Sequence, residues 1–525
     1  EVDLIVHNAL IYTVDSSFSQ AEAFAVKDGK FLEIGSSQDI LEKYQATEKL
    51  DAEGQALYPG FIDAHCHYYR YSQGLQVANL VGSQSYKEIQ DILLAFKKEN
   101  PEAAWIVGRG WDQNDWENKA FPNKAPLDSL FPNTPVYLVR VDGHAALANQ
   151  KALDLAGVDT STPDILGGSI IKENGALTGV LIDNAMGKVS SQIPEPDKKA
   201  KRKLILDAQA NCFAVGLTGV HDAGLSRDVI EFIDALQQEK ALKMRLYIMI
   251  SSTQENLDYY LEKGPFKNDH LNVSSFKIYA DGALGSRGAC LLQPYSDAQG
   301  EVGFLKSTPE RLDSLVKVVG AKGFQVNTHC IGDSANRLIL DIYGKYLDKE
   351  NDRRWRIEHA QIVNTQDIGK FAEFKVIPSV QPTHATSDMY WADERLGDQR
   401  IKEAYTFKDL LKQNNYVALG SDFPVEDINP LFGFYAAIAR QDAAAYPEGG
   451  FQMENALSRE EALKGMTIWA AYSAFEENQK GSIEAGKFAD FVILKKDIMK
   501  VDPLEARNAK VWQTYLGGQL VYKSE

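Results

Sequence analysis

Eight short apolar segments in the middle of the chain alternate with helical or polar stretches. The segments are residues 57–65, 218–222, 244–250, 274–281, 324–329, 355–359, 376–381 and 416–422. Parallel strands that are buried on both faces have this short, apolar character. The stretches between them include candidate helices at residues 228–240, 309–322, 334–347 and 365–374. Eight such units predict an α/β fold built on a (β/α)8 barrel of the TIM type.

The two ends of the chain have a different pattern, with short strands separated by turns. Residues 3–14 are a candidate strand pair, and residues 23–34 are a candidate hairpin that turns at residues 27–30. Residues 488–494 and 511–523 are also candidate strands, the second broken by two glycines. Because chain ends often lie close together, we expect one small β-sandwich domain from residues 1–56 plus 481–525. The barrel then takes residues 57–480.

About 150 residues separate the first two barrel strands, far more than one crossover helix requires. This stretch contains an aromatic run at residues 105–116, a strand-like segment at 135–141 and the pair Gly143-His144. We expect a large insertion at about residues 100–200 that lies above the barrel mouth. The alternative is an independent domain without a role in the site.

Composition excludes some classes of protein. A chain of 525 residues is too long for one compact core, and its net charge of −17 disfavours nucleic acid and anionic membranes as partners. No apolar stretch reaches the ~20 residues that span a bilayer. The four cysteines form no CxxC pair, and the chain begins at Glu1. Neither fact decides between a cytoplasmic and a periplasmic location.

Residues with metal-binding chemistry stand on the predicted strands, all but Lys277 at or just after the carboxyl end. They are His65, His67, Lys277, His329, His359 and Asp422. His65 and His67 are two apart, so they share one face of a strand. The carboxyl ends of the strands form the active-site face of a TIM barrel, where these side chains would converge. Imidazoles and a carboxylate bind a divalent metal such as zinc, and the carboxylate can also accept a proton.

Several ordered blocks carry a resemblance to a known family. They are YPGFIDAHCH (58–67), FKIYADGALGSR (276–287), HCIGD (329–333), RIEHA (356–360), GSDFP (420–424) and GSIEAGKFAD (481–490). Together they resemble the metal-dependent amidohydrolase superfamily, and within it the YtcJ-like subgroup that includes N-substituted formamide deformylase. The resemblance runs through nearly the whole chain. It implies a barrel hydrolase with one or two divalent metals, zinc being the expected metal, and a small-molecule substrate.

The resemblance also implies roles for individual residues. His65, His67 and Asp422 would hold a first metal, and His329 and His359 a second. Lys277 matches the lysine that is carboxylated in many members and then bridges both metals, although some members keep a single metal. Dimers are common among such enzymes, so a homodimer is possible.

Other residues are candidates for contacts with substrate. His144 would donate a hydrogen bond to the substrate carbonyl oxygen, or be an ordinary loop histidine. Asp281 and Arg287 would either orient a polar group of the substrate or pair with each other. Trp111 would wall the pocket, or be ordinary core, and His384 lies on the predicted rim. Glu358 alternates with His359, so we expect it to face the helix layer.

The leading interpretation is a metal-dependent hydrolase that cleaves a C–N bond other than a peptide bond, in an amide, an N-formyl or N-acyl compound or a cyclic amide. Metal-activated water would attack, with Asp422 as the proton shuttle. One alternative keeps the barrel and metals but attacks an ester, lactone or phosphoester, since fold does not fix function. Another is a non-catalytic regulatory protein that binds a ligand on the same scaffold.

Overall fold

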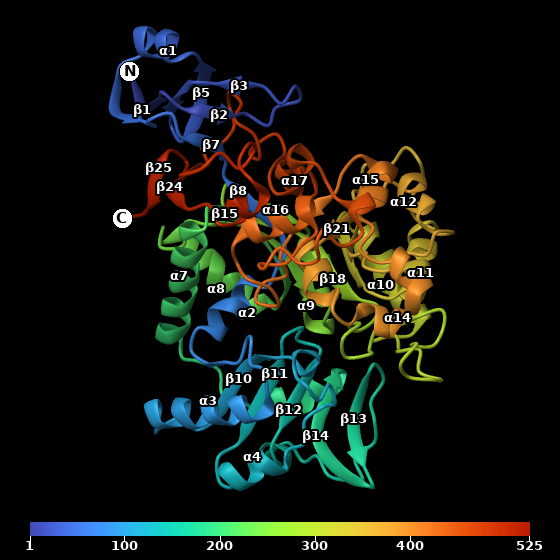
Figure 1. Cartoon of the computed structure of the whole chain (residues 1–525). Coiled ribbons are helices and arrows are strands. Elements are labelled where there is room, and N and C mark those ends of the chain that lie inside the picture. The colour runs from blue at the N-terminus through green and yellow to red at the C-terminus, as the bar shows by residue number, and fades with distance from the viewer.

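A parallel eight-stranded barrel forms the centre of the computed structural model, which describes residues 1–525 (Figure 1). The strand order is β22-β21-β20-β19-β18-β16-β15-β8, and every neighbouring pair along it is parallel. The strands are β8 (Phe61–Cys66), β15 (Leu217–Leu225), β16 (Arg245–Ser251), β18 (Leu271–Tyr279), β19 (Gln325–Cys330), β20 (Arg356–His359), β21 (Ile377–Val380) and β22 (Ala418–Leu419). The predicted barrel is confirmed.

The barrel closes where the segment after β22 meets β8. Asp422 donates its backbone N–H to the carbonyl of His65 at 2.7 Å, and His67 donates to the carbonyl of Phe423 at 2.8 Å. A Cβ at Gly420 would lie 2.5 Å from the backbone nitrogen of His65, so only glycine allows this approach. The closure brings the first and last candidate metal ligands of the chain together.

Helices cover the outside of the barrel, and they follow the predicted segments with one clear exception. They include α8 (Arg227–Gln238), α10 (Pro309–Ala321) and α11 (Asp333–Tyr343). In α8 the buried residues Val229, Ile230, Ile233 and Leu236 form one face, as an amphipathic helix requires. The segment 365–374 contains only the short α12 (Gly369–Glu373). No helix of the structure has the length and apolar character needed to cross a membrane.

Two strand predictions were wrong. The segment 57–65 is not one strand, because β7 (Ala56–Pro59) and β8 lie in different sheets on either side of Gly60. A Cβ at Gly60 would lie 2.2 Å from Thr218 Oγ1, so the chain crosses from one sheet to the other at a residue without a side chain. Likewise β1 (Val2–His7) and β2 (Leu10–Tyr12) do not pair with each other but belong to separate sheets.

The chain ends form two further sheets. One has the order β5-β4-β1-β6, from β4 (Ala23–Lys27), β5 (Lys30–Gly35) and β6 (Ala46–Asp51) with β1. The other has the order β25-β24-β23-β7-β2-β3 and joins β3 (Gln20–Ala21) to β23 (Phe491–Leu494), β24 (Val511–Leu516) and β25 (Gln519–Lys523). A core of 14 buried residues draws on both ends of the chain, with Phe24 and Phe31 packed against Phe491.

Between β8 and β15 the chain builds a six-stranded sheet of order β13-β14-β12-β11-β10-β9. Its strands are β9 (Ala78–Asn79), β10 (Ile106–Trp111), β11 (Val136–Arg140), β12 (Ala145–Ala148), β13 (Gly168–Glu173) and β14 (Ala176–Asp183). The sheet therefore begins upstream of the expected boundary near residue 100. In Figure 1 this sheet and the two terminal sheets lie on opposite sides of the barrel.

A buried ion pair ties the barrel to the terminal sheets. Arg245 at the start of β16 contacts both carboxylate oxygens of Asp490, at 2.6 and 2.9 Å, and both side chains are 5% exposed. Asp490→Ala leaves a buried guanidinium without its carboxylate, so we expect a loss of about 3–5 kcal/mol in the free energy of unfolding. Urea denaturation measures this loss. The exposed pair of Lys87 and Asp91 supplies the control, since Asp91→Ala should cost less than ~1 kcal/mol. Equal losses in the two variants would show that the buried pair contributes no more to the free energy of unfolding than the exposed pair.

Candidate active site

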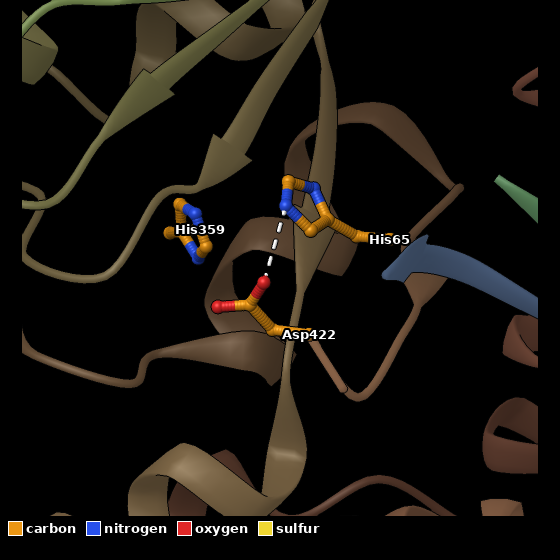
Figure 2. Close-up of side chains that lie close together, drawn as sticks. All are labelled: His65, His359 and Asp422. Atoms are coloured by element: carbon orange, nitrogen blue, oxygen red, sulfur yellow. Dashed lines mark ion pairs between the residues drawn. The ribbon is translucent and has the colours of Figure 1, made fainter. Parts of the chain in front are cut away.

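Three side chains that are far apart in the sequence meet at the carboxyl end of the barrel. His65 lies near the end of β8, His359 ends β20, and Asp422 follows β22. Their ligand atoms all lie within 4.8 Å of one another, and all three residues are buried. Figure 2 shows the His65 ring and the Asp422 carboxylate facing one another, with His359 beside them.

The carboxylate of Asp422 has an oxygen without a hydrogen-bond donor. Its Oδ1 lies 3.1 Å from His67 Nε2 and 3.5 Å from His65 Nε2, yet it is buried and accepts no hydrogen bond. A buried carboxylate oxygen without a donor is costly unless a cation lies beside it. Two imidazole nitrogens and this oxygen therefore form a donor set that fits a divalent metal.

The four histidines of the cluster are held in the form that binds metals. Burial lowers the pKa of His67 to about 3 and lowers the pKa of His65, with neighbouring positive charges adding to the effect. Burial also places the pKa values of His329 and His359 well below the usual range. Neutral imidazoles, unlike imidazolium ions, have a lone pair for a metal.

Glu358 contacts His65 and orients its ring. The sequence analysis did not predict this role for Glu358. Its Oε2 contacts His65 Nδ1, and its Oε1 lies 2.7 Å from Arg356 Nε, all within the barrel interior. The expectation that Glu358 faces the helix layer was therefore wrong. Arg356 and Glu358 are two apart and share the inner face of β20. That spacing was the signal in the sequence that could have revealed Glu358.

Each of the other three histidines of the cluster has one ring nitrogen within hydrogen-bond distance of an oxygen atom. His67 Nδ1 lies 2.9 Å from the carbonyl of Ala223, and His359 Nδ1 lies 2.7 Å from Gln381 Oε1. Such partners set the tautomer and the direction of a metal-binding ring. His329 lies with its ring centroid 4.6 Å from that of His359, and its Nε2 is 3.1 Å from the carbonyl of Gly282.

Lys277 projects from β18 into the same cluster. Its Nζ lies 3.2 Å from His65 Nε2, and the side chain forms no ion pair with a carboxylate. Burial lowers the pKa of Lys277 to about 8. An ammonium group in this place would repel a bound metal cation, so the amine has to be neutral, modified or displaced when a metal is present.

His144 lies at the edge of the cluster on the insertion. Its Nδ1 is 2.6 Å from Asp183 Oδ1, and Lys306 Nζ lies 3.1 Å from the same oxygen. Burial would raise the pKa of Asp183, but His144 and Lys306 outweigh it and hold the pKa below the usual value. With Nδ1 on Asp183, Nε2 is the atom left to reach a substrate.

Two cavities adjoin at this cluster. One of about 910 Å³ lies between the barrel mouth and the insertion, and one of about 430 Å³ lies beside it. His144, His329, His359 and Asp422 line both. His384 lines the larger cavity, where its Nε2 lies 3.8 Å from Asp422 Oδ2 and forms no hydrogen bond.

Three predicted substrate contacts lie away from the cavities. Asp281 is fully buried and accepts the backbone N–H groups of Cys290, Ile331 and Gly332. Arg287 pairs with Asp297 at 2.8 Å rather than with Asp281. Trp111 is 1% exposed in the core of the insertion, and its indole donates to the carbonyl of Leu138. None of the three lines either cavity.

The sequence of the chain was also compared with those of known protein families. A profile of the amidohydrolase family matches residues 48–522. The chain belongs to the amidohydrolase family. The resemblance that the sequence motifs carry is thereby confirmed, as is the prediction of an enzyme.

Individual relatives of this amidohydrolase align over almost its whole length. It is 35% identical over 544 residues to Protein LONG AFTER FAR-RED 3 of Arabidopsis thaliana, covering 99% of this chain and 91% of the relative. It is 31% identical over 527 residues to putative amidohydrolase YtcJ of Bacillus subtilis (strain 168), covering 99% of both. It is 27% identical over 551 residues to N-substituted formamide deformylase of Arthrobacter pascens, covering 99% and 98%.

A solved structure shares the fold. The crystal structure of an uncharacterized metal-dependent hydrolase from Pyrococcus horikoshii OT3 matches with a TM-score of 0.77 at 27% identity, covering 95% of this chain and 99% of that chain. The family, this neighbour and the donor cluster agree on a metal-dependent hydrolase.

Proposed function

We propose that this amidohydrolase cleaves the C–N bond of a small amide that is not a peptide, such as an N-formyl, N-acyl or cyclic amide. The observation that carries the proposal is the buried Asp422 oxygen without a donor, surrounded by neutral imidazoles beside a large cavity. The similarity to N-substituted formamide deformylase adds support for a C–N bond over other acyl bonds.

The ligands proposed for a first zinc ion are His65, His67 and Asp422, and those for a second are His329 and His359. When bound, such a metal would activate a water molecule and polarise the substrate carbonyl. Asp422 would take the proton of the attacking water on a carboxylate oxygen and pass it to the leaving nitrogen. His144 would donate Nε2–H to the carbonyl oxygen as negative charge develops there.

We infer that Lys277 is carboxylated in the loaded enzyme. The neutral amine would form an N–C bond to CO₂ and release a proton, which gives a carbamate with two ligand oxygens. The support is its place, buried and 3.2 Å from His65 Nε2, without a carboxylate to pair with an ammonium group. Conversion to an anion removes the repulsion between an ammonium group and the metals.

We also infer a division into domains around the barrel. Residues 1–56 and 481–525 would form a β-sandwich together with β7, which extends past residue 56, supported by the core that their strands share. The insertion would form a wall of the substrate cavity, supported by the residues of this segment that line it, such as Arg140 and His144.

Stripping the protein with a chelator and restoring zinc with bicarbonate tests the proposed function. We expect the stripped protein to be inactive and the restored protein to hydrolyse members of a panel of N-formyl, N-acyl and cyclic amides. Matched esters and lactones belong in the same panel. Turnover of esters with none of amides would overturn the assignment to a C–N bond, and inactivity of the restored enzyme on every substrate would overturn the proposal.

A further inference from the structure

Two arginines near the active site have no carboxylate partner. Arg70 lies in α2 (Tyr68–Gly74), three residues after His67, and forms neither an ion pair nor a hydrogen bond. Arg109 lies in β10 of the insertion and forms no ion pair. Its Nη2 donates to the carbonyl of Val141 at 3.1 Å, and its buried Nε has no partner. Arg140 on the next strand differs, since it pairs with Asp112 and with Asp142 at 2.6 Å.

The guanidinium groups of Arg70 and Arg109 converge on one point, above Gly143. A Cβ built on Gly143 would lie 3.0 Å from Arg70 Nη1, and 3.6 and 3.9 Å from Arg109 Nη1 and Nη2. Burial lowers the pKa of Arg109 to about 9, and the charge of Arg70 contributes to the shift. Arg70 is exposed and Asp422 and Asp142 offset part of the charge, and an anion bound between the two guanidinium groups would offset the repulsion that is left.

This point lies next to the groups assigned to catalysis. Gly143 directly precedes His144, so the two Cα atoms are about 3.8 Å apart. Arg70 lines the smaller cavity and Arg109 the larger one, and the cavities share His144 and Asp422. A group bound by the arginines would therefore be only a few bonds from a carbonyl that contacts His144.

We propose that Arg70 and Arg109 together bind a carboxylate of the substrate, close to the amide that is cleaved. This inference rests on the proposed function and narrows it to amides that carry a carboxylate, as in N-acyl amino acids. Guanidinium groups match the planar carboxylate with paired N–H donors. Asp142 and Asp422 line the same cavities, and their negative charges disfavour a dianion such as phosphate.

A matched pair of substrates tests the carboxylate subsite. N-Acetylphenylalanine and N-acetylphenylalaninamide contain the same acetyl amide, with and without the carboxylate. We expect Arg70→Gln and Arg109→Gln each to lower kcat/KM for the acid by roughly 10- to 100-fold, the range of a charge-assisted hydrogen bond. The same variants should change kcat/KM for N-acetylphenylalaninamide, which lacks the carboxylate, by less than about threefold. Arg311→Gln on α10 is the control, since Arg311 is exposed and forms no ion pair.

The outcomes separate the subsite from the proposed function. Hydrolysis of both substrates with equal losses in the arginine variants, or with none, would overturn the subsite and leave the proposed function in place. If neither substrate is hydrolysed, calorimetric titration of the zinc-loaded protein with N-acetylphenylalanine decides. Binding that is lost in the Arg70→Gln/Arg109→Gln double variant and kept in Arg311→Gln would support the subsite. Absence of binding to the unaltered protein would overturn it.

Discussion

Asp422→Asn is expected to lower kcat by about 10²- to 10⁴-fold on any substrate that the enzyme hydrolyses, which is the usual contribution of a positioned proton carrier. Asp422 lies beside His67 and His65, and a metal cation held there would favour the charged carboxylate, which can accept a proton. The amide of Asn has almost the same shape but cannot accept the proton of an attacking water. Steady-state kinetics on the restored enzyme measures the loss.

The interpretation of this result requires that the variant be folded and loaded with metal. Circular dichroism and metal analysis of Asp422→Asn provide both checks. Asp398→Asn is the matched control, because Asp398 is exposed and forms no ion pair, and its kcat should stay near that of the unaltered enzyme. If Asp422→Asn binds metal normally and retains near-normal kcat, Asp422 is not the proton shuttle.

The barrel was predictable because its signal is local and repeated. Each strand is a short apolar run, and polar ligands stand at the ends of several of them, so small errors in a boundary do not change the topology. The split at Gly60 was not predictable in this way, because β7 and β8 are continuous in apolar character. Only the close approach of Thr218 explains why the chain changes sheets there.

The convergence of His65, His359 and Asp422 was predictable for the same reason, but the groups that contact them were not. Strand alternation places Glu358 and His359 on opposite faces, yet both contact the cluster. The reason is the backbone of His359, whose φ of 77° ends the strand and redirects the side chain. A non-glycine residue in this region is strained, and such strain is held in place by the surrounding structure at functional sites.

Contacts between residues on separate elements could not be predicted from the sequence. The motif that contains Asp281 and Arg287 suggested that they contact substrate or each other. Their actual partners are the backbone after β19 and Asp297, respectively. Trp111 is in an aromatic run that would suit either a pocket wall or a core, and the packing of the insertion decides for the core. Hydrophobicity alone does not distinguish those two environments.

Glu358→Gln is expected to weaken both the metal site and the fold. Glu358 contacts His65 Nδ1 and is paired with Arg356, and all three side chains are fully buried. Loss of a carboxylate that orients a ligating histidine typically lowers metal affinity about 10- to 100-fold. Loss of charge beside a buried arginine should reduce the free energy of unfolding by about 3–5 kcal/mol. Competition with a chelator measures the affinity, and urea denaturation of the metal-free protein measures the stability.

Glu426 offers a matched control at the same cavity. Burial raises the pKa of Glu426 to about 8, so its carboxyl group is mostly protonated at pH 7 and Gln resembles that neutral form. Glu426→Gln should therefore change stability by less than ~1 kcal/mol, although it is the same substitution at a partly buried place on the same cavity. A Glu358→Gln variant that loses stability but binds metal with unaltered affinity would show that Glu358 supports Arg356 alone. Unaltered stability and affinity would contradict both of its assigned contacts.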